Sequence, residues 1–173
     1  MHYLHRILVK VDNGDKREDQ IEYAREYAES QTEAYYGIVW DWRETETAGR
    51  WTEEYPTNVI FAADDVDKFV AELNDCRNSQ INFIKNSIEM AKQFNVDVAD
   101  SLNSDTLEQL YNAPFHVGLY GLKTALEVLT GCYVSNSYFY NTENGECKIT
   151  NELIENIKQV PEKYALVMFD YHN

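Results

Sequence analysis

The residues best suited to acid–base chemistry lie at the two ends of the chain. His5 and Arg6 occupy the first segment, while Asp170 and His172 occupy the last. A histidine changes its charge near neutral pH, a carboxylate can orient it, and an arginine can stabilise a phosphorane. If the terminal segments pair, this set could cleave RNA through its 2′-hydroxyl without a metal. His2 and His5 are three residues apart, hence on opposite faces of a strand. The plainer interpretation is that these are solvated polar residues at frayed termini.

A second candidate site is a segment rich in tryptophan and carboxylates. All three tryptophans, Trp40, Trp42 and Trp51, fall within twelve residues. Tryptophan and arginine are the residue types that most often anchor protein–protein interfaces. The simpler alternative is that Trp40 and Trp42 share one strand face and fill the core. The predicted partner-binding residues are Asp41, Arg43, Glu44, Glu46, Trp51, Glu53 and Glu54.

No cofactor or metal is expected from the motifs. The sequence has no GxxxxGK[ST] phosphate loop, GxGxxG fingerprint, HExxH pair, GxSxG elbow or C-x-x-C pair. Asp64, Asp65, Asp67 and Glu72 cluster where a long helix is expected to begin, which is where the helix dipole favours carboxylates. We therefore interpret them as capping residues, and leave open whether the chain is an enzyme.

The net charge of the chain limits the classes of partner that it can bind. Its 173 residues carry 30 acidic and 15 basic side chains, for a net charge of −15. Such a surface repels phosphate, so general DNA binding and anionic membranes are disfavoured. It favours a protein partner with a basic surface, although acidity also simply serves solubility. The N-terminus has no signal-like apolar stretch and the three cysteines form no paired motif, so we expect a cytoplasmic protein.

The pattern of apolar residues predicts a single α+β domain over residues 1–173. A mixed or antiparallel sheet should carry several helices on it, because strands and helices do not alternate regularly. One long amphipathic helix begins at Val66 and runs for about thirty residues, or roughly 45 Å. It could be bent, broken near Asn78-Ser79, or paired with a second copy in a homodimer. Strands are predicted at 2–11, 35–42, 58–63, 132–140, 147–149 and 164–171, and further helices at 16–33, 104–112, 116–130 and 150–160. Residues 43–57 should form an exposed loop, or a hairpin with its turn near Ala48-Gly49.

Three stretches carry a family resemblance: MHYLHRILVKVD at the start, WDWRETETAGRWTEEYPTNVIFAADD in the middle and YALVMFDYHN at the end. Together they resemble a family of small proteins of bacterial plasmids, conjugative elements and phages. Such families include anti-CRISPR proteins directed at Cas9-type nucleases, some of which act through loss or truncation of the guide RNA. The resemblance implies an inhibitor of a Cas9–guide RNA complex and supplies no site residues. The alternatives are a metal-independent ribonuclease and a dimeric accessory module without activity of its own.

Overall fold

The computed structural model describes residues 2–12, 16–93 and 138–172. The chain divides into two compact units, residues 1–77 with 134–173 and residues 78–133. The helices predicted at 104–112 and 116–130, and most of the strand predicted at 132–140, lie outside the described residues. The described elements are β1 (His2–Lys10), α1 (Arg17–Thr32), η1 (Glu33–Tyr35), β2 (Trp42–Glu44), η2 (Gly49–Trp51), β3 (Val59–Phe61), α2 (Val66–Gln93), β4 (Phe139–Asn141), α5 (Asn151–Gln159), η4 (Pro161–Lys163) and β5 (Tyr164–His172).

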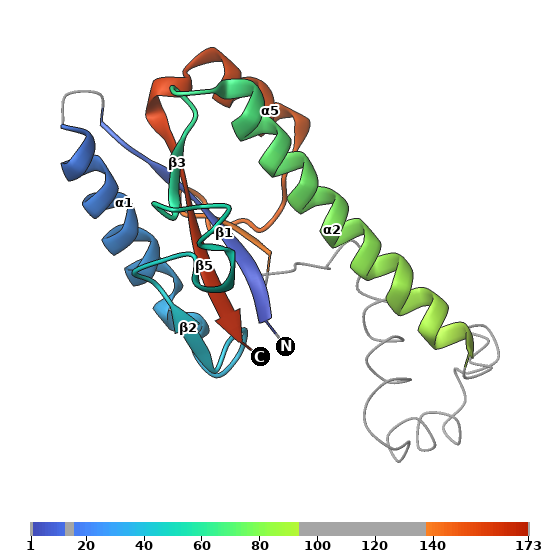
Figure 1. Cartoon of the computed structure of the whole chain (residues 1–173). Helices are drawn as coiled ribbons and strands as arrows, with labels where there is room; N and C mark the ends of the chain where they lie inside the picture. The colour runs from blue at the N-terminus through green and yellow to red at the C-terminus, as the bar shows by residue number, and fades with distance from the viewer. Residues whose placement is uncertain (1, 13–15, 94–137, 173) are drawn as a thin grey trace. The chain divides into compact units, whose positions relative to one another are not determined.

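The sheet of the first unit is built around the two terminal strands (Figure 1). β1 and β5 pair antiparallel along their whole length, and β4 adds to β1 in the parallel direction. β2 and β3 both pair antiparallel with β5, at its two ends. β5 is therefore hydrogen-bonded on both edges, which explains why every residue from Tyr164 to Tyr171 is buried. This mixed sheet with its helices confirms the predicted α+β class.

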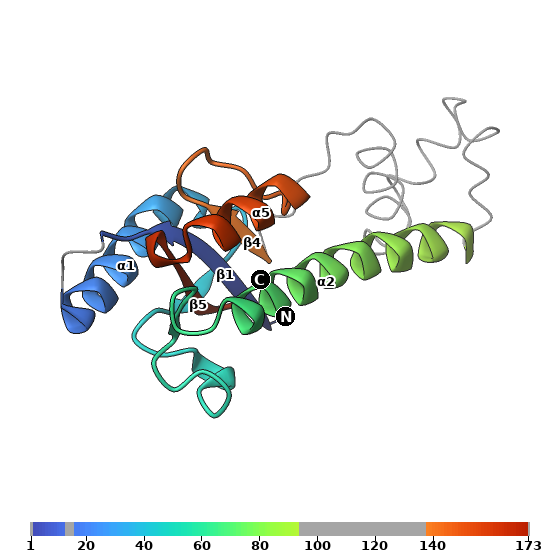
Figure 2. The same ribbon diagram turned by 90° about the horizontal axis from the view of Figure 1, so that it is seen from above.

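Each face of the sheet is covered by helices (Figure 2). Successive strand residues point to opposite faces, so Leu4 and Leu8 of β1 belong to one core and Ile7 and Val9 to the other. The first core is completed by α2 and α5, and the second by α1. The small buried residues of α1, Ala24 and Ala28, let its backbone approach the sheet closely.

The long helix α2 begins as the sequence predicts. The Asp65 side chain accepts a hydrogen bond from the Lys68 backbone N–H at 2.9 Å, which caps the first turn. Its first turns bury Phe69, Leu73 and Cys76 against the sheet. The helix continues through Asn78-Ser79 to Gln93, so a break at that point is excluded. The predicted homodimer stays a prediction.

The strand predicted at 35–42 is wrong. The chain instead turns between Tyr36 and Trp40, with Gly37 at a φ of 73° and its N–H donating to the Trp40 carbonyl at 2.8 Å. β2 therefore starts only at Trp42. Trp40 is buried and Trp42 is 47% exposed, so the two rings do not fill the core together. Gly37 can adopt a positive φ, so the chain turns at a position where the sequence pattern predicts a continuous strand.

The loop predicted at 43–57 is only partly exposed. Ala48 and Tyr55 are both buried in the core beneath α2, and η2 lies between them. The segment thus crosses one face of the first unit and contributes to its packing.

Candidate functional site

The two ends of the chain meet at one end of the sheet (Figure 1). The β1–β5 register places His2 directly opposite His172, and directly opposite residues share a face. The two imidazole rings meet edge to face, with centroids 4.9 Å apart. Nδ1 of His2 lies 2.8 Å from Asp170 Oδ1, and Nδ1 of His172 lies 2.7 Å from Asp41 Oδ1. Each histidine is therefore oriented by its own carboxylate, through the nitrogen nearer the backbone.

The two carboxylates of this junction lie in different environments. Asp170 is buried, and its second oxygen accepts a hydrogen bond from the Arg50 backbone N–H at 3.2 Å. Asp41 is exposed, and the hydrogen bond with His172 holds the pKa of its carboxyl below the usual value. Asp170 is therefore a fixed structural support, whereas Asp41 and His172 face solvent.

The structure does not bring His5 to this junction. His5 lies on the opposite face of β1, fully buried against Tyr171 with ring centroids 4.4 Å apart. Burial lowers its pKa to about 3, so the imidazole is neutral at physiological pH. Arg6 shares a face with His2, but its guanidinium is paired with Glu72 at 3.2 Å. Of the four predicted catalytic residues, only His172 and Asp170 lie at the junction, and His2 stands where His5 was expected.

Arg43 of the tryptophan-rich segment is part of the fold. Its side chain is only 6% exposed, and its guanidinium pairs with Glu29 at 3.2 Å and Glu33 at 2.5 Å. It also donates to the Thr32 hydroxyl at 3.1 Å and lies 4.3 Å over the Trp40 ring. Arg43 therefore ties β2 to the end of α1 and offers little surface to a partner.

The other predicted contact residues are divided between fold and surface. Trp51 is half-buried and packs against the core beneath α2. The Glu44 carboxylate accepts hydrogen bonds from the backbone N–H groups of Glu46 and Thr47, which shapes the turn after β2. The carboxylates that remain exposed are Asp41, Glu46, Glu53 and Glu54.

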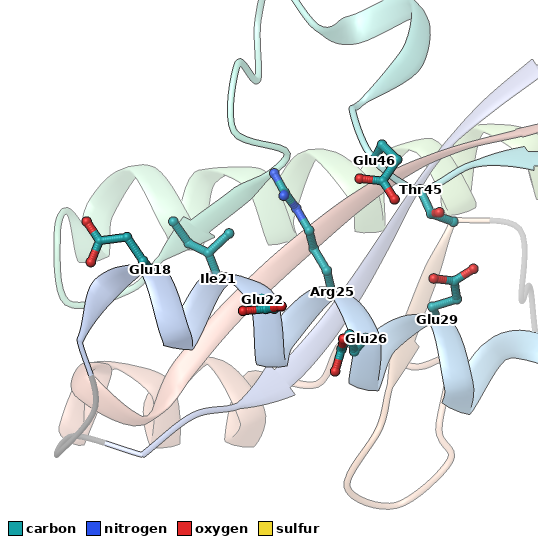
Figure 3. A pocket seen from close by; sticks show the side chains of 8 residues that line it. All are labelled: Glu18, Ile21, Glu22, Arg25, Glu26, Glu29, Thr45 and Glu46. Atoms are coloured by element: carbon teal, nitrogen blue, oxygen red, sulfur yellow. The ribbon is translucent and has the colours of Figure 1, made fainter.

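An acidic groove lies between α1 and the segment that follows β2 (Figure 3). It encloses about 400 Å³, and Thr45 and Glu46 face Glu29 of α1 across it. Among the described residues that line it, Arg25 is the only basic one. The lining residues are Glu18, Ile21, Glu22, Arg25, Glu26, Glu29, Thr45 and Glu46.

The charge of the groove is concentrated on one face of α1. Glu18, Glu22 and Glu26 follow one another at intervals of four residues, so neighbouring carboxylates repel. Arg25 is directed away from them, because its guanidinium donates to Asn58 Oδ1 and to the Thr57 carbonyl, both at 2.6 Å. This groove was not among the sites predicted from the sequence, although the four-residue spacing of these glutamates indicates one acidic helix face.

Neither metal-binding clusters nor membrane-spanning helices are present among the described residues. Within them, no group of three or more histidine, cysteine or acidic side chains is arranged to hold a metal ion. None of the helices in those same ranges is both long and apolar enough to cross a bilayer.

The candidate site thus consists of an acidic groove on α1 and a junction of paired histidines at the end of the sheet. Comparisons with protein-family models, with curated proteins and with solved structures found no match for this chain.

Proposed function

We propose that this protein is an acidic inhibitor that occupies a basic, nucleic-acid-handling surface of a protein partner. The acidic groove is the observation that carries the proposal. Five glutamates line one concave surface, and within the described ranges only Glu29 among them is paired with a cation, Arg43. The arginine that lines the surface, Arg25, donates to neutral acceptors. Carboxylates at a concave surface can take the place of phosphates on a basic partner, because opposite potentials steer and orient association.

The proposed partner is a Cas9-type nuclease with its guide RNA. Such effectors hold nucleic acid in positively charged channels, which an acidic protein can enter. The family resemblance of the terminal and central segments supports the same target. The proposed role is that of an anti-CRISPR protein of a mobile element, acting in the host cytoplasm as a nucleic-acid mimic.

The repulsion between neighbouring glutamates of α1 fits a binding surface. Glu22 and Glu26 are one helical turn apart and exposed, an arrangement that costs an isolated helix about 0.2–0.5 kcal/mol. A binding surface tolerates such a cost, because the charge is neutralised only when the partner arrives.

Charge-matched variants test the proposal. The groove variant Glu22→Gln/Glu26→Gln and the control Glu152→Gln/Glu155→Gln on α5 each remove two exposed carboxylates. Binding to a Cas9–guide RNA complex is measured over a range of salt concentrations. We expect the groove variant alone to bind at least tenfold more weakly and to show a shallower salt dependence. Equal binding by both variants would show that net charge, and not the groove, drives association.

The paired histidines support a second function, metal-independent cleavage of RNA. Each Nδ1 is held by a carboxylate, which leaves Nε2 of His2 and of His172 for proton transfer. In the proposed reaction one imidazole takes the proton of the 2′-hydroxyl as that oxygen attacks phosphorus. The other, protonated, donates to the departing 5′-oxygen, so a cyclic phosphate and a free 5′-hydroxyl form.

Two substrates and one variant test this second function. We would incubate the protein with single-stranded RNA and with the same sequence as DNA, in the presence of a chelator. His2→Asn/His172→Asn should abolish cleavage of RNA, and DNA should stay intact because it lacks the attacking hydroxyl. Cleavage that survives in this variant would remove the histidine pair from the reaction.

A further inference from the structure

A short apolar turn projects from the first unit directly after α1. The Tyr36 turn, residues 36–38, has the sequence Tyr-Gly-Ile. Its Ile38 side chain is 75% exposed and its Tyr36 side chain 63% exposed, the two highest values among the exposed large apolar residues of the described chain. Polar residues, glycine and proline usually occupy turns, so a tyrosine and an isoleucine at this tip are not explained by turn chemistry.

The turn is held in one conformation by its backbone. The N–H groups of Ile38 and Val39 both donate to the Tyr35 carbonyl, at 3.0 and 2.9 Å. Gly37 adopts a φ of 73° and donates to the Trp40 carbonyl, which closes the turn. The Tyr36 and Trp40 rings meet edge to face, with centroids 5.1 Å apart.

The base of the turn is anchored in the core. Val39 and Trp40 are both buried, and the Arg43 guanidinium lies over the Trp40 ring. The exposed pair therefore stands on a rigid support. A preorganised anchor of this kind loses little conformational entropy when it enters a pocket.

The acidic residues around the turn favour a partner with a basic surface. Between Arg25 and Arg43 the chain carries four acidic residues and no lysine or arginine. Arg43 pairs with two of the four, Glu29 and Glu33. Glu29, which lines the acidic groove, lies only one turn of helix before the end of α1, and the Tyr36 turn follows η1 at once. The α1 residues that line the acidic groove and the Tyr36 turn are therefore close to each other in the sequence.

We infer that the Tyr36 turn is the apolar anchor of the interface made by the acidic groove. Ile38 and Tyr36 enter an apolar pocket on a protein partner, and lysines and arginines around that pocket meet the carboxylates of α1. Interface energy is concentrated in a few buried apolar or aromatic side chains, while surrounding charges steer the encounter and set its register. This inference rests on the proposed function, because it assumes that the acidic face binds a basic protein.

The test compares three variants by their affinity for a Cas9–guide RNA complex. Ile38→Ser removes the most exposed anchor, and Tyr36→Ser/Ile38→Ser removes both. Ile81→Ser, at an exposed isoleucine of α2, is the matched control. Ile38→Ser tests the anchor without disturbing the Tyr36–Trp40 contact. Thermal unfolding of each variant establishes that it is folded.

We expect Ile38→Ser to weaken binding about tenfold and the double variant further, each with the salt dependence of the unaltered protein. Ile81→Ser should bind as the unaltered protein does. If the turn variants also bind normally, the inference is overturned while the proposed function stands. If the unaltered protein does not bind the complex at all, the proposed function fails and the inference fails with it.

Discussion

Gly49 is predicted to be the most sensitive glycine of the described chain, because it lies against the carboxylate that holds His2. A Cβ at Gly49 would lie 2.4 Å from both Cβ and Oδ2 of Asp170. Asp170 cannot move away, because it is buried and bonded to the His2 ring and to the Arg50 backbone. The φ of Gly49 is also positive, at 55°. Gly49→Ala therefore combines a strained backbone with a clash.

Gly37 supplies the matched control. Its φ of 73° imposes a similar backbone strain, but a Cβ there meets no atom within 4 Å. We expect Gly37→Ala to cost about 1 kcal/mol from the left-handed backbone alone. Gly49→Ala should cost about 3 kcal/mol, because overpacking adds roughly 2 kcal/mol.

Urea unfolding, monitored by tryptophan fluorescence, measures the free energy of unfolding of each glycine variant and of the unaltered protein. The difference between the two variants isolates the contact with Asp170. Equal losses in the two variants would show that Asp170 moves aside without cost and is not a fixed support.

Three further predictions concern stability. Arg43→Met should cost about 2 kcal/mol in urea unfolding, because it removes the hydrogen bond of a buried side chain to Thr32 and its contact with the Trp40 ring. The exposed Arg50→Met should change stability by less than about 0.5 kcal/mol, and similar losses in both variants would contradict the burial of Arg43. His5 binds a proton in the unfolded chain below pH 6.5 but in the folded chain only near pH 3, so stability falls as pH drops through that window. Relative to a His5→Leu variant, the protein should lose about 2 kcal/mol between pH 6.5 and about pH 5, and parallel pH profiles would count against a neutral buried His5. Thr150→Ala should lower the free energy of unfolding by about 1 kcal/mol, because the Thr150 hydroxyl accepts a hydrogen bond from the Leu153 backbone N–H at 3.1 Å. Thr150→Ser keeps a hydroxyl and should lose little, so a serine variant as unstable as the alanine variant would argue against this helix cap.

The terminal strands could be predicted because their apolar residues are dense and β-branched, and because both strands are buried on two faces. The alternation of a strand also placed His2 and His5 on opposite faces. It could not say which of them meets His172, because the pairing register of two strands decides that, and register depends on the whole sheet.

The segment from Tyr35 to Trp42 shows where local pattern misleads. Its aromatic and β-branched residues are typical of a strand, yet the positive φ of Gly37 makes a turn. The burial of Arg43 was equally beyond the sequence, because it depends on where α1 ends relative to β2. The glutamates of α1 were predictable as one helix face, but only the fold shows Glu46 completing a groove with them.

One incubation tests directly whether the protein inhibits a Cas9-type nuclease through its acidic groove. The protein is mixed with Cas9 and guide RNA, target DNA is added, and both nucleic acids are followed on denaturing gels. We expect target cleavage to stop while the guide RNA stays whole, and the Glu22→Gln/Glu26→Gln variant to inhibit more weakly. Unaffected cleavage would contradict the proposed target, and a shortened guide would shift the function from the acidic groove to the paired histidines.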